Sequence, residues 1–189
     1  MKKYAVYAAV LIALSGCASL LKQDGHRAHV VLSPNFDRSR HKAVAVLPFK
    51  QKGKTGHDEA LSDEFSMELM AMGFVVVERD RLESAMKDSD IPMDGSVSLD
   101  KLKKISELLE LDCMVIGSVY YATIPSSVNV ESGKSIYDIQ KIALRFVDMK
   151  TGEVLISASC TPVFGGTMIK EIGIKLRQMI GAGKTVPAQ

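Results

Sequence analysis

The sequence contains few of the residues from which most catalytic and metal sites are built. It has four histidines and three cysteines among 189 residues, and three of the histidines lie between residues 26 and 41. His26 and His29 have no third ligand at a fitting spacing, so they do not predict a metal site. No serine stands in a Gly-x-Ser-x-Gly nucleophile elbow, and His57 is the only histidine expected inside the folded domain. The sequence therefore predicts a protein that is not an enzyme, without catalytic residue, metal or cofactor.

Long apolar runs and net charge are missing as well. The apolar run Tyr4–Leu14 is well short of the roughly 20 residues that a membrane-spanning helix needs. When Lys2 and Lys3 are set aside, the 24 basic residues fall to 22, which equals the number of acidic residues. A chain without excess positive charge lacks the electrostatic footprint of a nucleic-acid-binding protein. Nucleic acid is therefore excluded as an expected partner.

A complete phosphate-binding loop is also absent. The Gly-Lys-Thr segment at 53–55 follows an expected strand, but Pro48 stands where such a loop needs its leading glycine. The second Gly-Lys-Thr segment, at 183–185, has Gln178 in that position. Too few glycines remain to wrap backbone N–H groups around a phosphate, so no nucleotide partner is expected.

The most informative residues that are present lie at the N-terminus. Two lysines precede the apolar run Tyr4–Leu14, and the small residues Ser15 and Gly16 then lead to Cys17. This order is typical of a secretory signal peptide. The last four residues look like a bacterial lipobox, in which the chain is cleaved between Gly16 and Cys17 and Cys17 is lipidated. The alternatives are an ordinary signal peptide with a chance cysteine, or a short buried helix.

The lipobox also predicts the location and the domain layout. Lipid chains on Cys17, palmitate among them, would anchor the protein stably in a membrane. Residue 18 is alanine, not the aspartate that retains lipoproteins at the inner membrane, which in a Gram-negative host predicts the outer membrane, facing the periplasm. We expect four segments: a signal peptide at 1–16, a lipidated N-terminus and tether at 17–42, a folded domain at 43–181 and a flexible tail at 182–189.

The folded domain alternates between strand and helix patterns. Short apolar or β-branched runs predict strands at 42–49, 74–78, 113–121, 136–147 and 153–160. Helical periodicity and capping residues predict helices after Asp58, near Arg79 with a capping box at Asp80 and Glu83, after Ser98 and near Met168. The order βαβααβββα predicts an α/β (α+β) fold, with a mixed sheet of about five strands flanked by helices.

The two cysteines of the folded domain have two possible states. An exported protein could join Cys113 and Cys160 in a disulfide. Cys113 begins one expected strand and Cys160 ends another, and in a meander these strands run parallel, two places apart. The cysteines would then lie at opposite ends of the sheet, which favours two buried, unreactive thiols.

Four segments of the domain together resemble a known family. They are Ala43–Phe49, Phe74–Leu82, Leu111–Val119 and Phe146–Leu155. Their order and spacing resemble the periplasmic domain of the CsgG family, the curli secretion-channel lipoproteins. The chain also looks like relatives on the same scaffold, namely lipoprotein activators of penicillin-binding proteins and flagellar outer-membrane lipoproteins. The resemblance covers roughly residues 42–180 and implies a CsgG-like periplasmic fold.

The chain departs from that family where the pore would be. The resemblance implies two β-hairpins per subunit in a shared membrane barrel, and each spanning strand needs roughly 9–11 residues. The first candidate hairpin, Ala122–Lys141, is barely long enough and contains Pro125 and several charges. The second, Ser159–Gly166, is far too short. Neither alternates as a lipid-facing strand does, so channel activity is not expected.

These observations lead to a functional hypothesis with one alternative. We expect a non-enzymatic outer-membrane lipoprotein that acts as a periplasmic scaffold or accessory subunit in the assembly or secretion of a surface structure. The alternative is a lipoprotein regulator or activator of a cell-wall synthase, a penicillin-binding protein. The expected partners are the membrane, through the lipid on Cys17, and proteins of an envelope assembly or cell-wall complex. A homo-oligomer is also possible.

Overall fold

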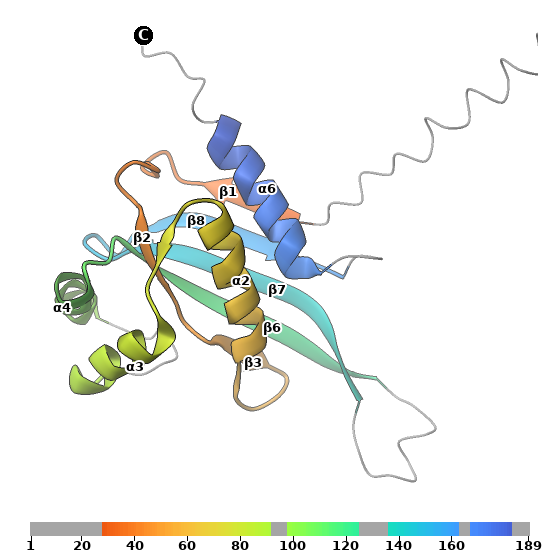
Figure 1. Ribbon diagram of the computed structural model, residues 1–189. Coiled ribbons are helices and arrows are strands. Elements are labelled where there is room, and N and C mark those ends of the chain that lie inside the picture. The colour runs from red at the N-terminus through yellow and green to blue at the C-terminus, as the bar shows by residue number, and fades with distance from the viewer. Residues whose placement is uncertain (1–27, 92–97, 125–135, 163–166, 183–189) are drawn as a thin grey trace, which may run out of the picture.

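One mixed β-sheet forms the centre of the molecule (Figure 1). The structure, a computed structural model, describes residues 28–91, 98–124, 136–162 and 167–182. The sheet has eight strands. Six of them follow the order β1-β8-β7-β6-β2-β5, and the other two lie off this path, where β3 pairs with β6 and β4 pairs with β3. Their bounds are β1 Ala28–Leu32, β2 Ala43–Val46, β3 Phe49–Lys52, β4 His57–Asp58, β5 Val75–Val76, β6 Cys113–Ile124, β7 Ile136–Asp148 and β8 Val154–Cys160. The mixed α/β fold predicted from the sequence is confirmed.

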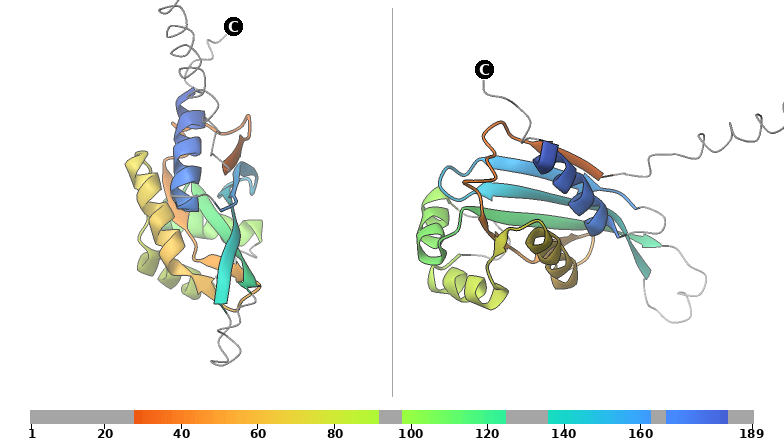
Figure 2. Two further views of the ribbon diagram at one scale, coloured as in Figure 1. Left: turned by 90° about the vertical axis from the view of Figure 1, so that its right-hand side faces the viewer. Right: turned by 45° about the horizontal axis from the view of Figure 1, so that its top comes forward.

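Helices cover the two faces of the sheet unequally. They are α2 Glu59–Ala71, α3 Arg79–Asp88, α4 Leu99–Leu109 and α6 Met168–Ala182. Helices α2 and α6 lie side by side across one face (Figures 1 and 2), where they pack on Val115, Leu144 and Phe146. Helices α3 and α4 pack on side chains of the other face, such as Met114 and Val147. Successive strand residues point to opposite faces, so the sheet is enclosed by two separate cores.

The first strand expected from the sequence is divided in two. Both β2 and β3 pair in parallel with β6, the former at Cys113–Val115 and the latter at Ser118–Tyr120. Pro48 stands between them and has no N–H with which to continue the ladder. The chain then turns back, and β4 pairs antiparallel with β3, in a segment where the sequence analysis predicts no strand. Strands β3 and β4 are two of the additional strands that raise the number from about five expected to eight observed.

Helix α2 begins where the sequence predicts. Asp58 is its N-cap, and the carboxylate oxygen Oδ1 accepts a hydrogen bond of 3.1 Å from the backbone N–H of Leu61. Gly73 follows the helix with a φ of +80°, a conformation that favours glycine. The capping box predicted for α3 is wrong, because Glu78 is the N-cap of that helix and Asp80 lies in its first turn.

The N-terminal edge of the sheet differs from expectation. Residues Ala28–Leu32, which lie within the expected tether, form β1 and pair antiparallel with β8, from Ala28 opposite Cys160 to Leu32 opposite Ile156. Ala28 and Val30 are buried against the core. The fold therefore includes at least part of the segment 28–42, and only the ten residues 18–27 separate Cys17 from the first described strand.

The hairpin of β6 and β7 is longer than the sequence predicts. Its ladder runs from Cys113 opposite Asp148 to Ile124 opposite Ile136, with a bulge between Tyr120 and Tyr121. The middle of the first candidate pore hairpin, residues 125–135, lies outside the described residues, as do residues 163–166 of the second. In the described part of the chain, no helix combines the length and the apolarity that a membrane crossing requires.

The prediction of two buried cysteines without a disulfide between them is confirmed. Cys113 and Cys160 are both buried, and neither forms a disulfide. On β7, Cys113 lies opposite Asp148 whereas Cys160 lies opposite Ile142. Six residues of extended strand span about 20 Å, far more than the roughly 7 Å between Cα atoms that a disulfide tolerates.

Candidate functional site

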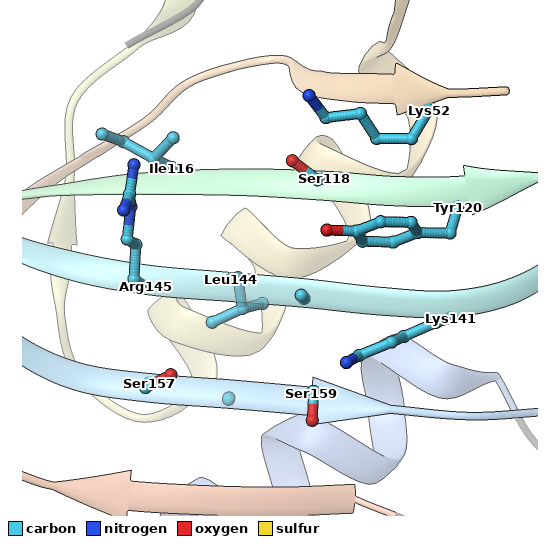
Figure 3. A pocket seen from close by; sticks show the side chains of 11 residues that line it. Lys52, Ile116, Ser118, Tyr120, Lys141, Leu144, Arg145, Ser157 and Ser159 are labelled. Carbon is cyan, nitrogen blue, oxygen red and sulfur yellow. The ribbon is translucent and has the colours of Figure 1, made fainter. Parts of the chain in front are cut away.

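The most prominent site is a hollow on the sheet surface opposite α2 and α6. Helices α3 and α4 cover this surface only where β6 begins, and beyond them it holds a shallow hollow of about 430 Å³ over β3, β6, β7 and β8 (Figure 3). We call this uncovered surface the open face. Its polar side chains are those of Lys52, Ser118, Tyr120, Lys141, Arg145, Ser157 and Ser159.

Strand alternation explains why these side chains gather there. On β7, Ile142, Leu144 and Phe146 are buried under α2 and α6. Because alternate residues of a strand point to opposite faces, Lys141 and Arg145 stand on the open face, and both are exposed. The amphipathic pattern of β7 thus places its two cations on one surface.

Strand register aligns these side chains in rows across the sheet. Tyr120 on β6 lies directly opposite Lys52 on β3 and Lys141 on β7. Arg145 lies directly opposite Ser157 on β8. Neighbouring strands are about 4.8 Å apart. The side chain of Tyr120 therefore stands between the ammonium groups of Lys52 and Lys141, and the guanidinium group of Arg145 lies beside the hydroxyl of Ser157.

The charge of the open face has one sign. The side chains of Lys52, Lys141 and Arg145 are exposed, and no aspartate or glutamate lines the hollow within the described residues. Lysine and arginine donate charge-assisted hydrogen bonds to carboxylate and phosphate, and serine hydroxyls add weaker ones. No histidine is among the described residues that line the hollow. His29 lies on the neighbouring edge strand β1, opposite Ser159. The arrangement is suited to binding an anion.

A second candidate cluster, His41 and Asp148, is buried. His41 is only 4% exposed, although the sequence places it in the tether and leaves His57 as the only histidine of the domain. Its Nε2 lies 3.2 Å from the Asp148 carboxylate, and the backbone N–H of Asp37 donates to its Nδ1 over 3.1 Å. Because Nδ1 accepts a hydrogen bond, Nε2 carries the proton and donates it to Asp148. Both ring nitrogens are occupied within the protein.

Cys113 lies next to this pair but cannot act as its nucleophile. The thiol is fully buried, and burial, followed by the nearby charges of Asp148 and Asp112, raises the pKa of Cys113 to about 12. A thiol with such a pKa is protonated at neutral pH and unreactive. Since His41 has no ring nitrogen available to accept its proton, the cluster stabilises the fold and has no catalytic geometry.

The hydrogen bonds of Asp148 should make the stability of the fold depend on pH. Burial alone would raise the pKa of Asp148, but hydrogen bonds from the backbone of Thr151 and Lys150 and from His41 outweigh it, so the pKa lies below its ordinary value. A carboxylate with a lowered folded-state pKa stabilises the fold above about pH 4, and this stabilisation is lost as the pH falls through the folded-state pKa.

We expect Asp148→Asn to lower the free energy of unfolding at pH 7 by about 1–3 kcal/mol. Both carboxylate oxygens accept hydrogen bonds, one from His41 and the other from backbone N–H groups, so the NH2 group of asparagine would face a donor on one side. Urea unfolding of wild type and variant at pH 7 and at about pH 3 measures this difference. The difference should narrow at the lower pH. An equal difference at both pH values would contradict the role of the ionised carboxylate.

A larger hollow of about 590 Å³ at the β5 end of the sheet is less suited to an anion. Its Arg38 guanidinium stacks 3.7 Å from the ring centroid of Phe74. Its Arg177 lies 3.6 Å from a carboxylate oxygen of Glu68. Lys42 also lies in this hollow, but much of the lining is apolar, with Met72, Val75 and Ile180. Polar side chains dominate the open face, which is therefore the stronger candidate for an anion.

The residues that the sequence singled out and the residues of the open face do not coincide. Gly16 and Cys17 lie outside the described residues. His57 lies in β4 and is exposed. Among the described residues, no three His, Cys, Asp or Glu side chains are grouped so that they could hold a metal ion. The alternation of Lys141 and Arg145 with apolar residues is the sequence signal that could have indicated the open face.

Comparison with known proteins identifies one family. The model of the family described as "Curli production assembly/transport component CsgG" matches residues 38–164. No curated protein matches the sequence.

Several solved structures are similar to this one, all with TM-scores below 0.5. The LpoB C-terminal domain from Salmonella enterica is 13% identical with a TM-score of 0.48, covering 69% of this chain and 87% of its own. Lipoprotein GNA1162 from Neisseria meningitidis is 15% identical with a TM-score of 0.46, covering 77% and 99%. A PelC dodecamer from Paraburkholderia phytofirmans is 12% identical with a TM-score of 0.43, covering 81% and 93%.

Proposed function

Because more than half of this chain matches the family model, it belongs to the CsgG family, and from that premise we propose that it is a non-enzymatic outer-membrane lipoprotein. It would act as a periplasmic scaffold or accessory subunit in the assembly or secretion of a surface structure. Family membership supports an accessory role in the cell envelope. The observation that carries the proposal is the open face, because its exposed cations are suited to binding an anion.

The proposed anchor is a lipid on Cys17, the product of cleavage after Gly16. From Cys17 to Ala28 the chain can span at most about 40 Å when fully extended. The domain would therefore stay close to the membrane that holds the lipid. This short reach disfavours the alternative role as a regulator of a penicillin-binding protein, unless that synthase comes equally close to the same membrane.

Labelling with radioactive palmitate tests the anchor. Cells that produce the wild-type chain or Cys17→Ala are labelled, and the protein is recovered from the membrane and soluble fractions. We expect Cys17→Ala to lose the label and to leave the outer-membrane lipoprotein fraction. Cys160→Ala is the matched control, because its thiol is buried in the sheet and its loss should leave the label unchanged. Equal labelling of Cys17→Ala and wild type would refute the proposed anchor.

Crosslinking in intact envelopes tests the partner. An assembly role predicts that the main adducts are components of a secretion or surface-assembly complex, or further copies of this chain. A penicillin-binding protein as the main adduct would replace the proposed role with the regulatory one.

A further inference from the structure

The open face is cationic and continuous with β1, the described strand nearest the proposed anchor. Strand β1 lies at the edge of the sheet, with His29 opposite Ser159 and Val31 opposite Ser157. Since both serines line the hollow of the open face, alternate residues of β1 stand on that same face. The chain therefore enters the domain along one border of the cationic surface.

We propose that the open face binds the phosphate headgroups of the membrane in which the chain is anchored. This inference rests on the proposed lipid at Cys17, which would bring the domain to that membrane. The sheet would lie with β3, β6, β7 and β8 toward the headgroups and with α2 and α6 toward the periplasm. The lipid would hold the chain in the membrane, and the open face would set the orientation of the domain.

Charge complementarity supports a phosphate surface. Lys52, Lys141 and Arg145 reach the open face from β3 and β7, with no carboxylate lining the hollow among the described residues (Figure 3). Each lysine or arginine close to an anionic membrane surface strengthens association roughly fivefold, an effect that falls off within a Debye length. Three such cations together favour the bound orientation on the order of a hundredfold.

Shape and composition support the same occupant. A membrane surface is broad and requires no deep pocket, and the open face is a shallow hollow on a sheet. Tyr120, which is 41% exposed, stands between Lys52 and Lys141. Tyrosine is enriched at the level of lipid headgroups, because its ring is apolar and its hydroxyl is polar. Val31, 50% exposed on β1, adds an apolar side chain at the border.

Because the segment from Cys17 to Ala28 is short, a weak contact between the open face and the membrane is enough to orient the domain. With at most about 40 Å from Cys17 to Ala28, a lipid-anchored domain encounters its own membrane at a high effective concentration. Binding of the open face then needs only to select one orientation. An acidic protein partner would fit the same charge but would gain nothing from this tether.

The test uses the full lipidated protein in nanodiscs that contain phosphatidylcholine with phosphatidylglycerol and a nickel-chelating lipid. A spin label is attached at Ser157→Cys on the open face or at Met67→Cys, which is 59% exposed on α2. Cys113 and Cys160 are buried, and Cys17 carries the lipid, so labelling is selective. We expect headgroup-bound nickel to relax the label at position 157 several-fold more strongly than the label at position 67.

Charge reversal on the open face should remove this contrast. The reversed variant carries Lys52→Glu, Lys141→Glu and Arg145→Glu. The control variant has the same change in net charge at three exposed residues outside the hollow. Its substitutions are Arg81→Glu, Lys87→Glu and Lys170→Glu. We expect the reversed variant to lose the roughly hundredfold bias toward the bound orientation and the control to retain it. Nanodiscs of phosphatidylcholine alone should also weaken the contrast.

The outcomes separate this inference from the proposed function. A protein that stays in the nanodisc but relaxes equally at both labels would overturn the membrane contact and leave the lipid anchor intact. Crosslinking of the open face to an acidic protein, without nickel relaxation, would overturn it in favour of a protein partner. If the wild-type chain carried no palmitate and did not associate with the nanodisc, the proposed anchor would instead be refuted.

Discussion

Replacement of Phe65 by alanine is expected to lower the free energy of unfolding by about 3–5 kcal/mol. Phe65 is fully buried on α2, and its ring lies between those of Phe49 on β3 and Phe146 on β7, with centroids 6.2 and 6.1 Å away. The substitution would leave a cavity between α2 and the sheet and would remove both ring contacts. Urea unfolding followed by circular dichroism measures the loss.

The matched control for Phe65→Ala lies two residues further along the same helix. Met67 is 59% exposed, so Met67→Ala should change the free energy of unfolding by no more than about 0.5 kcal/mol. A small effect of Phe65→Ala, comparable with that of Met67→Ala, would show that α2 does not hold the aromatic cluster against the sheet.

Gly117→Ala is the second substitution with a large expected effect. Gly117 lies in the middle of β6, and a Cβ atom added there would approach ring atoms of Phe49 to 2.2 Å. The Phe49 ring is fully buried and packs on Phe65, so it has no free space into which to move. Overpacking of this kind costs about 1–3 kcal/mol, occasionally more. Thermal and urea unfolding both measure it.

Gly173→Ala on α6 is the control for Gly117→Ala, because it introduces the same methyl group at another glycine. A Cβ atom at Gly173 would come within 2.6 Å of a carboxylate oxygen of Glu68, which is nominally a similar clash. That oxygen is the far end of a flexible side chain that can rotate away. Alanine also favours a helix over glycine by up to about 1 kcal/mol. We expect Gly173→Ala to be neutral or stabilising, and equal destabilisation by both substitutions would contradict the argument.

The parts of the fold that the sequence predicts well are those with strong local signals. Helix α2 has its cap at Asp58, a buried stripe through Phe65 and Leu69, and Gly73 at its end. The β7–β8 hairpin has its turn at Asp148–Gly152, where the carboxylate of Asp148 accepts hydrogen bonds from two backbone N–H groups. In each case the residues that determine the element are neighbours in the chain.

The parts that the sequence misses depend on distant partners. Strand β1 is five residues long, and its backbone is paired by β8 from the far end of the chain. His41 is buried because Asp148 receives its N–H across 107 positions of sequence. Local periodicity contains no information about either partner. For this reason the sequence assigned Ala28–Leu32 and His41 to a tether, although both belong to the folded domain.

The sequence could have indicated only part of the open face. Alternation along β7 shows that Lys141 and Arg145 share one side of a strand, but not whether a helix covers that side. Coverage is decided by how far α3 and α4 extend over the sheet, which is a property of the packed molecule. The row from Lys52 through Tyr120 to Lys141 likewise requires the register of three strands.

The position of β1 has a mechanical consequence. Any tension that reaches the domain through the residues before Ala28 acts first on the five registered pairs between β1 and β8. An edge strand is held by one neighbour only, so its hydrogen bonds can be lost while the rest of the sheet remains paired. Peeling of β1 would uncover the backbone of β8 from Ile156 to Cys160. The strand that receives the load is thus an edge strand, held in the sheet by β8 alone.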